Sequence, residues 1–484
     1  MPVEQKDGER EKVLPSTFDS PRMLSMFGGV ENEQENGQYC NSQVRYEGRF
    51  EMIKSIEIEG YRILDGFTAD LGELTVVIGA NATGKSTLID CLQFIANCVR
   101  VPLNDAVKWE GGLGSVLNAS RKTDKLGWKL TFRKPTQHPA WSFLPLEEGS
   151  YVYEVAIGKD QYEQALPIYE VLRTEQPLGD HKDPLKFLEA TRYRSHVFDS
   201  SQHMLVPFDE AVGEDSQGLF KNLDEDASAE NNLKTPEEVS VQERLLRLAQ
   251  MRFVNEYPVP SWTRFLFTRY CFYPGFEVGR YSKLRMQPSE IQPHTILAPN
   301  GENLGTVLHE ILTRADHRNV ADNLRDFLRA AYPSFDNFFA ESTFGAPAKV
   351  LVTVRERGMN RNMQLWDLSD GMLRFLCLGT ALLNPVPPTL IAIDEPEVGF
   401  HPRLLPIVAD MIKTASETTQ VLVTTHSPDL LNCFDIDNVA VMARDENEIS
   451  WQRPGSRDSL KIMLRNVEGD SLGDLHRSGE LEAL

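Results

Sequence analysis

The sequence has few cysteines, no long apolar run and fewer basic than acidic residues. Its six cysteines among 484 residues are scattered, with no CxxC pair and no histidine at zinc-ligand spacing. This distribution indicates buried free thiols in a reducing compartment rather than disulfides or a zinc site. No apolar run approaches the ~18 residues of a membrane helix, and the N-terminus lacks a basic start followed by an apolar core. We therefore expect a cytoplasmic protein with no membrane partner.

Acidic residues outnumber lysine and arginine by 71 to 50, which gives a formal net charge of −21 and a pI near 5.0. This balance argues against a protein that permanently coats nucleic acid, although it permits a local basic groove. The hydrophobic content of 41% and the charged content of 25% are typical of a globular protein. A chain of this length has room for two or three domains.

The sequence does contain a phosphate-binding loop near its start. An apolar run at residues 74–78 leads into GANATGKS at residues 79–86, and a segment with helical periodicity follows. This order of strand, loop and helix is the context that the pattern GxxxxGK[ST] requires. In such a loop main-chain N–H groups and the lysine bind phosphates, and the hydroxyl after the lysine binds magnesium. The residues expected to bind nucleotide are Gly79, Asn81, Thr83, Gly84, Lys85, Ser86 and Thr87, with Ser86 also a magnesium ligand.

A second anion site is indicated in the last third of the chain. Ser369, Asp370 and Gly371 stand directly before a segment with an apolar helical pattern. The N–H groups at a helix N-terminus that begins with serine and glycine are suited to bind an anion. We therefore predict that Ser369 and Gly371 contact a phosphate group.

Two further apolar runs end in residues that suit phosphate chemistry. The run at 390–393 ends in Asp394 and Glu395, and the run at 421–424 is followed by Thr425 and His426. We expect the first run to form a strand beside the strand of the phosphate loop. Asp394 would then hold magnesium, and Glu395 would orient and deprotonate the attacking water. In an open parallel sheet the ligand lies at the carboxyl ends of the strands, so these residues are expected to meet there.

The motifs GANATGKST, LSDGM, IAIDEPEVGFHP and VTTHSP, in this order, resemble the ABC-type ATPase heads of the RecF, SMC and OLD group. The resemblance is closest to stand-alone AAA-type ATPases of bacteria and extends over residues 52–442. It implies an α/β P-loop NTPase fold, with an ABC-ATPase-like mixed or parallel sheet, an antiparallel β-subdomain and a helical insertion. It also implies ATP and Mg2+ as cofactors, with Lys85, Glu395 and His426 as catalytic residues.

In heads of this group the signature of one protomer, here Ser369 and Gly371, completes the nucleotide site of another. The resemblance therefore implies a homodimer or higher homo-oligomer that ATP closes and hydrolysis reopens. Only about 40 residues follow residue 442, too few for the nuclease domain of OLD proteins, which implies a separate effector protein. Two departures stand out: the signature reads LSDG instead of the LSGG of transporters, and His401 occupies the place of an aspartate. No Q-loop glutamine can be chosen.

Three functions from different classes follow from these observations. The first is the sensor ATPase of a bacterial antiviral defence system that acts with a separate effector. The second is a RecF-like repair ATPase that binds DNA, and the third is a scaffold that binds ATP without turnover. Asp394 and Glu395 are both present, which argues against the third.

The expected organisation has five parts. Residues 1–50 read as a disordered extension, which is either an accessory tail or the product of a mis-assigned start, and the globular protein is expected to start at Met52. The two halves of the ATPase head are placed at 51–157 and 301–442. An insertion or lid at 158–300 carries an acidic stretch, which is either a flexible loop or a partner-binding segment, and residues 443–484 form a tail.

Several side chains admit two interpretations. Arginine and aromatic residues alternate in the stretch 262–285, which suits either single-stranded nucleic acid or a strand with aromatic core residues. Tyr61 either stacks on adenine or ends a strand. Arg374 either contacts a phosphate of another subunit or lies on a helix surface. Glu397 and His401 either form an acid and base pair or have structural roles at a helix cap or D-loop.

Overall fold

The computed structural model describes residues 52–118, 125–133, 149–160, 162–178, 182–191, 194–199, 204–207, 245–251, 257–286, 289–290, 296–343, 349–445, 448–457 and 471–481. The expected extension at 1–50 and the acidic stretch at 208–243 lie outside these residues. Within the described ranges no helix is both long and apolar enough to cross a bilayer.

A six-stranded sheet carries the strands that precede the motifs. In spatial order its members are β10 (Tyr270–Tyr273), β15 (Leu390–Asp394), β16 (Gln420–Thr424), β3 (Leu74–Ile78), β17 (Val439–Asp445) and β18 (Glu448–Gln452). The first five are parallel, and β18 pairs antiparallel with β17. The expectation that β15 lies beside β3 is wrong, because β16 stands between them. All of β3 and β16 is buried, and such uniformly apolar strands carry no local information about their order in a sheet.

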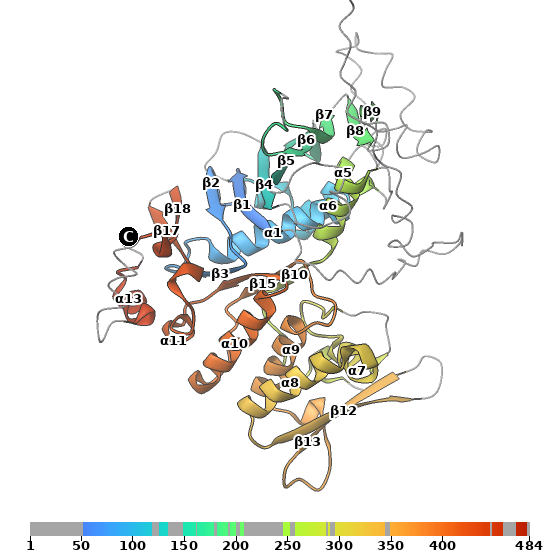
Figure 1. Ribbon diagram of the computed structural model, residues 1–484, viewed down its shortest axis with the longest axis vertical. Coiled ribbons are helices and arrows are strands. Elements are labelled where there is room, and N and C mark those ends of the chain that lie inside the picture. Colours follow the sequence, from blue (N-terminus) through green and yellow to red (C-terminus); the bar gives the residue numbers. More distant parts are fainter. Residues whose placement is uncertain are drawn as a thin grey trace, which may run out of the picture. The chain divides into compact units, whose positions relative to one another are not determined.

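The two faces of this sheet belong to two separate cores, because alternate side chains of each strand point to opposite faces. In β3, Val77 belongs to one core, whereas Val76 and Ile78 belong to the other. Helices α1 (Lys85–Arg100) and α6 (Pro258–Thr268) cover the first face (Figure 1). The second face is covered by helices α7 (Leu304–Thr313), α8 (Arg318–Ala331), α9 (Asp370–Leu382) and α10 (Leu405–Ser416).

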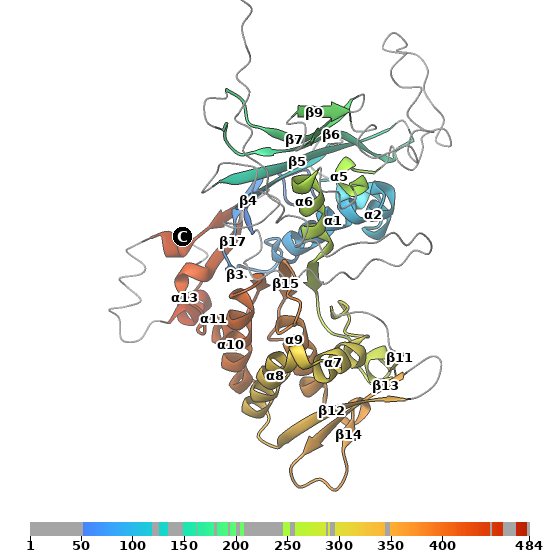
Figure 2. The ribbon, with the colours of Figure 1, turned by 45° about the vertical axis from the view of Figure 1, so that its right-hand side comes forward.

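An eight-stranded antiparallel sheet packs against the outer side of α1 (Figure 2). Its order is β2 (Phe67–Asp70), β1 (Ile53–Glu59), β4 (Leu126–Arg133), β5 (Ser150–Lys159), β6 (Ala165–Thr174), β7 (Lys186–Thr191), β8 (Ser195–Asp199) and β9 (Met204–Pro207). The predicted antiparallel β-subdomain is thus confirmed. The expected boundary at 157/158 falls inside β5, so the sheet continues into the segment that the sequence assigned to an insertion.

The remaining elements are short or form a hairpin. They are the helices α2 (Leu103–Trp109), α3 (Leu113–Val116), α5 (Arg247–Gln250), α11 (Pro428–Leu431) and α13 (Leu472–Ser478), and the strands β11 (Ser289–Glu290), β12 (Phe335–Thr343), β13 (Lys349–Glu356) and β14 (Met363–Gln364). Helices α7 and α8 contact α9 and β12 and share the second core, so they are part of the body of the fold.

The stretch that alternates arginine and aromatic residues forms helix α6 and strand β10, which lies at one edge of the six-stranded sheet beside β15. All four residues of β10 are buried, and Trp262 and Phe267 of α6 are buried as well. Arg269 donates to the carbonyls of Val386 and Pro387. The rings of Trp262, Phe267 and β10 are therefore core residues that are not available to stack on bases, whereas Tyr281 is 84% exposed.

Four of the cysteines, Cys91, Cys98, Cys271 and Cys377, are buried free thiols, in agreement with the expectation. Cys433 is free and half-buried, and Cys40 lies outside the described residues. Burial raises the pKa of the Cys271 thiol to about 11. This thiol therefore stays protonated at neutral pH.

Gln420, at the start of β16, links the two sheets through its side-chain amide. Its Oε1 accepts from the main-chain N–H of Ile53 at 2.9 Å, and its Nε2 donates to the carbonyls of Ile53 at 2.8 Å and Gly72 at 3.0 Å. The side chain is buried, at 2% exposure. Without it, these buried main-chain groups would lose their partners.

Replacing Gln420 by Ala is expected to destabilise the fold by about 3 kcal/mol, because each buried polar group left unpaired costs roughly 1–3 kcal/mol. The midpoint of urea unfolding measures this loss. Gln452→Ala is the matched control, since its side chain accepts a hydrogen bond from Arg457 at an exposed site. Equal midpoints for the two variants would contradict the prediction.

Candidate functional site

The phosphate-binding loop connects β3 to α1, and its backbone requires glycine at both ends. Gly79 has φ +151°, and a Cβ there would lie 2.1 Å from the carbonyl oxygen of Met442. Gly84 has φ +104° and precedes the first turn of α1. Between them the Thr83 hydroxyl donates to the Ala80 carbonyl at 2.9 Å. The loop is thus held in one conformation by sterics and by an internal hydrogen bond.

Lys85 lies inside the curve of this loop. Its Nζ donates to the carbonyls of Gly79 at 2.8 Å and Ala80 at 2.9 Å, and the residue is buried. Ser86 follows it in the first turn of α1 and is exposed, as is Asn81 in the loop. The loop therefore presents a fixed ammonium group, a free helix N-terminus and an accessible hydroxyl, the set of groups that binds a nucleotide phosphate with its metal.

Asp394 is the last residue of strand β15 and Glu395 follows it, and the adjacent strand β16 fixes both. The Thr424 hydroxyl donates to the Asp394 carboxylate, and the Glu395 N–H donates to the Thr424 carbonyl at 3.1 Å. Glu395 has φ +48°, a left-handed conformation that a non-glycine residue seldom adopts. The sequence interpretation misses Thr424. The sequence feature that could have pointed to Thr424 is a hydroxyl residue at the end of an apolar strand, because this strand lies next to the one that carries the acidic pair.

His426 follows β16 and lies beside Glu395, with 3.8 Å between its Nε2 and the Glu395 Oε1. Partial burial lowers the pKa of His426, and the nearby charge of Lys85 acts in the same direction. The carboxylates of Glu395 and Glu397 oppose these effects but do not reverse them. His426 is therefore neutral at pH 7. The charged groups that influence its pKa come from the start of α1 and from the segment after β15.

Glu397 holds the turn that carries His426. Its Oε1 accepts from the Thr425 hydroxyl at 2.6 Å and from the main-chain N–H groups of His426 and Ser427 at 3.0 and 3.1 Å. His401 instead accepts from the N–H of Arg403 at 3.2 Å, at the start of a 3-10 helix. Glu397 and His401 thus have separate structural partners, and the proposed acid and base pair is not formed.

Ser369 and Gly371 lie at the N-terminus of α9. The Ser369 hydroxyl accepts from the N–H of Met372 at 3.3 Å, so it caps the helix, and Ser369 is exposed. A Cβ on Gly371 would lie 3.6 Å from the Gly399 carbonyl oxygen, so this helix end approaches the turn after Glu395. In the described part of the chain, neither Ser369 nor Gly371 forms a hydrogen bond with the phosphate loop.

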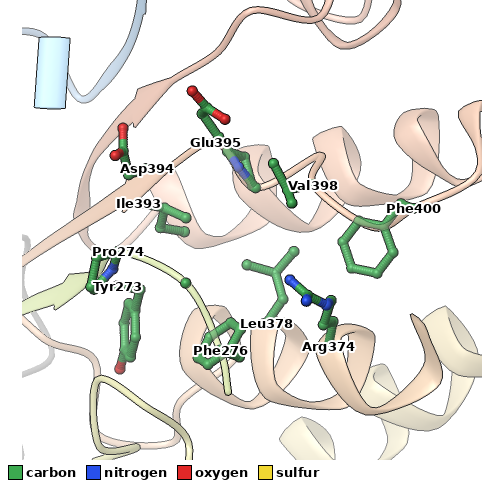
Figure 3. Close-up of a pocket in the computed structure, with 12 residues that line it drawn as sticks. Tyr273, Pro274, Phe276, Arg374, Leu378, Ile393, Asp394, Glu395, Val398 and Phe400 are labelled. Carbon is green, nitrogen blue, oxygen red and sulfur yellow. The ribbon is translucent and has the colours of Figure 1, made fainter. Parts of the chain in front are cut away.

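A pocket opens between the ends of β10 and β15 and helix α9. Most of the residues that line it are apolar, but Asp394 and Glu395 stand at one edge and Arg374 reaches in from α9 (Figure 3). The other lining residues are Tyr273, Pro274, Gly275, Phe276, Leu378, Ile393, Pro396, Val398 and Phe400. Arg374 therefore faces the interior of this pocket and is not a solvent-facing helix charge.

Tyr61 is fully buried and belongs to the core next to α1. Its ring centroid lies 5.6 Å from that of Phe94, and the Arg62 guanidinium lies over it at 5.3 Å. A buried ring has no face available to adenine. Of the two interpretations of Tyr61, the structural one is supported.

Two segments of the chain match models of ATPase families. Residues 52–194, which contain the phosphate loop, match a family described as "AAA ATPase domain". Residues 289–432, which contain the signature, Asp394, Glu395 and His426, match a family described as "AAA domain, putative AbiEii toxin, Type IV TA system". The search of curated proteins gave no match.

Solved structures of SMC heads are similar to the chain at low identity. One is a Smc head bound to the winged-helix domain of ScpA, with 11% identity, coverage of 84% of this chain and 99% of that chain, and a TM-score of 0.45. The Smc head from Pyrococcus furiosus has 13% identity, coverage of 86% and 100%, and a TM-score of 0.44. The SMC head domain from Thermotoga maritima has 12% identity, coverage of 83% and 98%, and a TM-score of 0.38.

The two matched segments together form one nucleotide fold. The first supplies β3, the phosphate loop and α1, and the second supplies α9, β15 and β16. The parallel sheet places β3 and β15 on either side of β16. The chain therefore has a P-loop nucleotide fold assembled from two separate segments, each of which is similar to an AAA ATPase family.

Proposed function

We propose that the protein binds ATP with magnesium and hydrolyses it at the carboxyl ends of β3, β15 and β16. The observation that carries this proposal is the convergence of Lys85, Glu395 and His426 at one edge of the sheet. Lys85 binds the β- and γ-phosphates, Glu395 orients and deprotonates the attacking water, and His426 contacts the γ-phosphate. Positioning and charge stabilisation of this kind carry most of the catalysis in phosphoryl transfer.

The residues present suit magnesium. Ser86 offers an exposed hydroxyl at the start of α1, and Asp394 offers a carboxylate that Thr424 orients. Hard oxygen ligands, with phosphate oxygens completing the set, are what Mg2+ prefers. When held by Ser86 and Asp394, the ion would neutralise negative charge that develops on the phosphates during transfer.

The rate of hydrolysis should depend on the protonation of His426. Because its pKa is lowered, kcat/KM should be constant above pH ~6.5, the ordinary value for histidine, and should fall only at lower pH. Below that pKa the imidazolium attracts the Glu395 carboxylate and withdraws it from water. His426→Gln should remove this acid limb in a pH–rate profile. A limb that survives the substitution unchanged would belong to another group.

ATP closure of a homodimer explains why the signature lies apart from the phosphate loop of its own chain. Ser369 and Gly371 form an exposed helix N-terminus that bonds to no group of that loop in the described residues. Such an end can bind the γ-phosphate held by a second copy. Each composite site would then contain the Lys85 of one chain and the Ser369 of the other.

Mixing two inactive variants tests this arrangement. Lys85→Ala keeps an intact signature, and Ser369→Glu keeps an intact phosphate loop, so only a mixed dimer contains one complete composite site. Each variant alone should release almost no phosphate, and the mixture should recover activity. Light scattering with and without ATP identifies the assembly. A mixture as inactive as its components would show that hydrolysis does not use a shared site.

The biological role we propose is that of a sensor ATPase in a bacterial antiviral defence system that controls a separate effector. The description of the second matching family as a putative toxin of a type IV toxin–antitoxin system supports this role. Phage challenge of cells that carry the gene with its neighbours, compared with Glu395→Gln, tests it. Equal phage yields in both strains and in cells without the gene would reject it.

A further inference from the structure

Arg285 reaches from a distant part of the sequence into the turn before α9. It lies in a 3-10 helix (Lys283–Arg285) and is 8% exposed. Its Nε donates to the Val278 carbonyl at 2.8 Å. Its Nη1 faces three carbonyls of the turn 365–368, at 2.8, 3.2 and 3.3 Å, and its Nη2 donates to the carboxylate of Asp370. The guanidinium thus contacts both the signature turn and the segment that follows β10.

These contacts require the several N–H donors of a planar guanidinium group. Arginine has five N–H donors in a fixed planar fork and is always charged, whereas lysine has three donors around one point. A buried charge needs both hydrogen bonds and an opposite charge. Among the described residues the carboxylate paired with Arg285 is that of Asp370, whose side chain is 66% exposed. The pair therefore has a buried positive member and an exposed negative member.

The position of Asp370 raises an electrostatic difficulty. It is the first residue of α9, so its carboxylate stands at the helix end that we propose binds a phosphate. An uncompensated negative charge there would repel the nucleotide. The Arg285 guanidinium, in direct contact with that carboxylate, offsets its charge and at the same time fixes the main chain that leads into the helix.

We propose that Arg285 is the positioning residue of the signature: it neutralises Asp370 and holds the N-terminus of α9 so that this end can bind the phosphate of ATP on a second chain. The inference rests on the proposed function. It adds a residue of the segment after β10, and the beginning of this segment, from Pro274 to Phe276, lines the pocket beside Glu395. Arg285 thereby connects the segment that lines the nucleotide site of its own chain with the signature, which contributes to the nucleotide site of the second chain.

Light scattering of the full chain with ATP and magnesium, in a Glu395→Gln background, tests the inference. Arg285→Lys and Arg285→Met should raise the ATP concentration needed for assembly at least ~tenfold. A fluorescent ATP analogue should bind single chains of both variants as before. Adding Asp370→Asn to Arg285→Met should recover part of the assembly, because the uncompensated carboxylate is removed. Arg361→Met is the matched control, since Arg361 pairs with Asp367 in the same turn but is exposed.

The outcomes separate the two proposals. If the Glu395→Gln parent does not assemble with ATP, the proposed composite site fails and the inference fails with it. If the parent assembles and the Arg285 variants assemble equally well, only the inference is overturned. It is also overturned if Arg285→Met lowers thermal stability and single-chain ATP binding as much as assembly and Asp370→Asn restores nothing, since Arg285 would then serve the fold alone.

Discussion

Replacing Glu395 by Gln is expected to lower the rate of phosphate release by about 10²- to 10⁴-fold, the range that general acid–base catalysis contributes. The amide keeps the size of the side chain but cannot take a proton from water. The left-handed backbone of Glu395 and its N–H bond to Thr424 remain available to glutamine, so the local geometry is retained. ATP affinity should therefore change little.

Phosphate release under saturating ATP, together with equilibrium binding of ATP, measures this effect. Glu417→Gln is the matched control, because Glu417 lies at the far end of α10 from the site. Its turnover should equal that of the wild type. Retained turnover in Glu395→Gln would reject Glu395 as the base, and a parallel loss of ATP affinity would assign it to binding instead of chemistry.

Lys85→Ala is expected to weaken ATP binding at least ~100-fold, equivalent to about 2.7 kcal/mol. The substitution removes the charged group that lies inside the phosphate loop, where no other lysine or arginine contacts the loop carbonyls among the residues that the structure describes. Hydrogen bonds to charged groups contribute roughly 1.5–3 kcal/mol each, and Lys85 would make more than one to the phosphates.

Isothermal titration with ATP and magnesium measures this loss. The control is Lys108→Ala, an exposed lysine on α2 that removes the same charge far from the loop. Because Lys85 is buried against two carbonyls, the melting temperature without nucleotide must be recorded as well. Unchanged ATP affinity in a folded Lys85→Ala protein would place the nucleotide elsewhere.

The parts of the fold that the sequence predicts are those with local causes. The run at 74–78, the loop glycines and the lysine after them follow from steric and hydrogen-bonding demands within a few residues. The same holds for the serine that caps α9 and for the acidic pair after β15. The predicted antiparallel strands carry alternation and turn residues, which are also local.

What the sequence misses depends on residues that meet only when the chain folds. The order of β3, β16 and β15 cannot be predicted from three equally apolar runs. The stretch 262–285 reads as a possible basic surface until α6 packs into the core and β10 is buried beside β15. Partial burial against neighbouring strands, together with the charge of Lys85, sets the pKa of His426, which composition cannot supply.

The sequence by itself determined the phosphate loop, the pair Asp394 and Glu395, and the position of His426 after an apolar strand. Only the tertiary structure decided that Thr424 orients Asp394, that Glu397 fixes the turn of His426, and that Arg285 meets Asp370 across 85 residues. The physical reason is that a motif fixes its own backbone through neighbouring atoms, whereas the partner of a polar side chain is chosen by the packing of strands and helices remote in sequence.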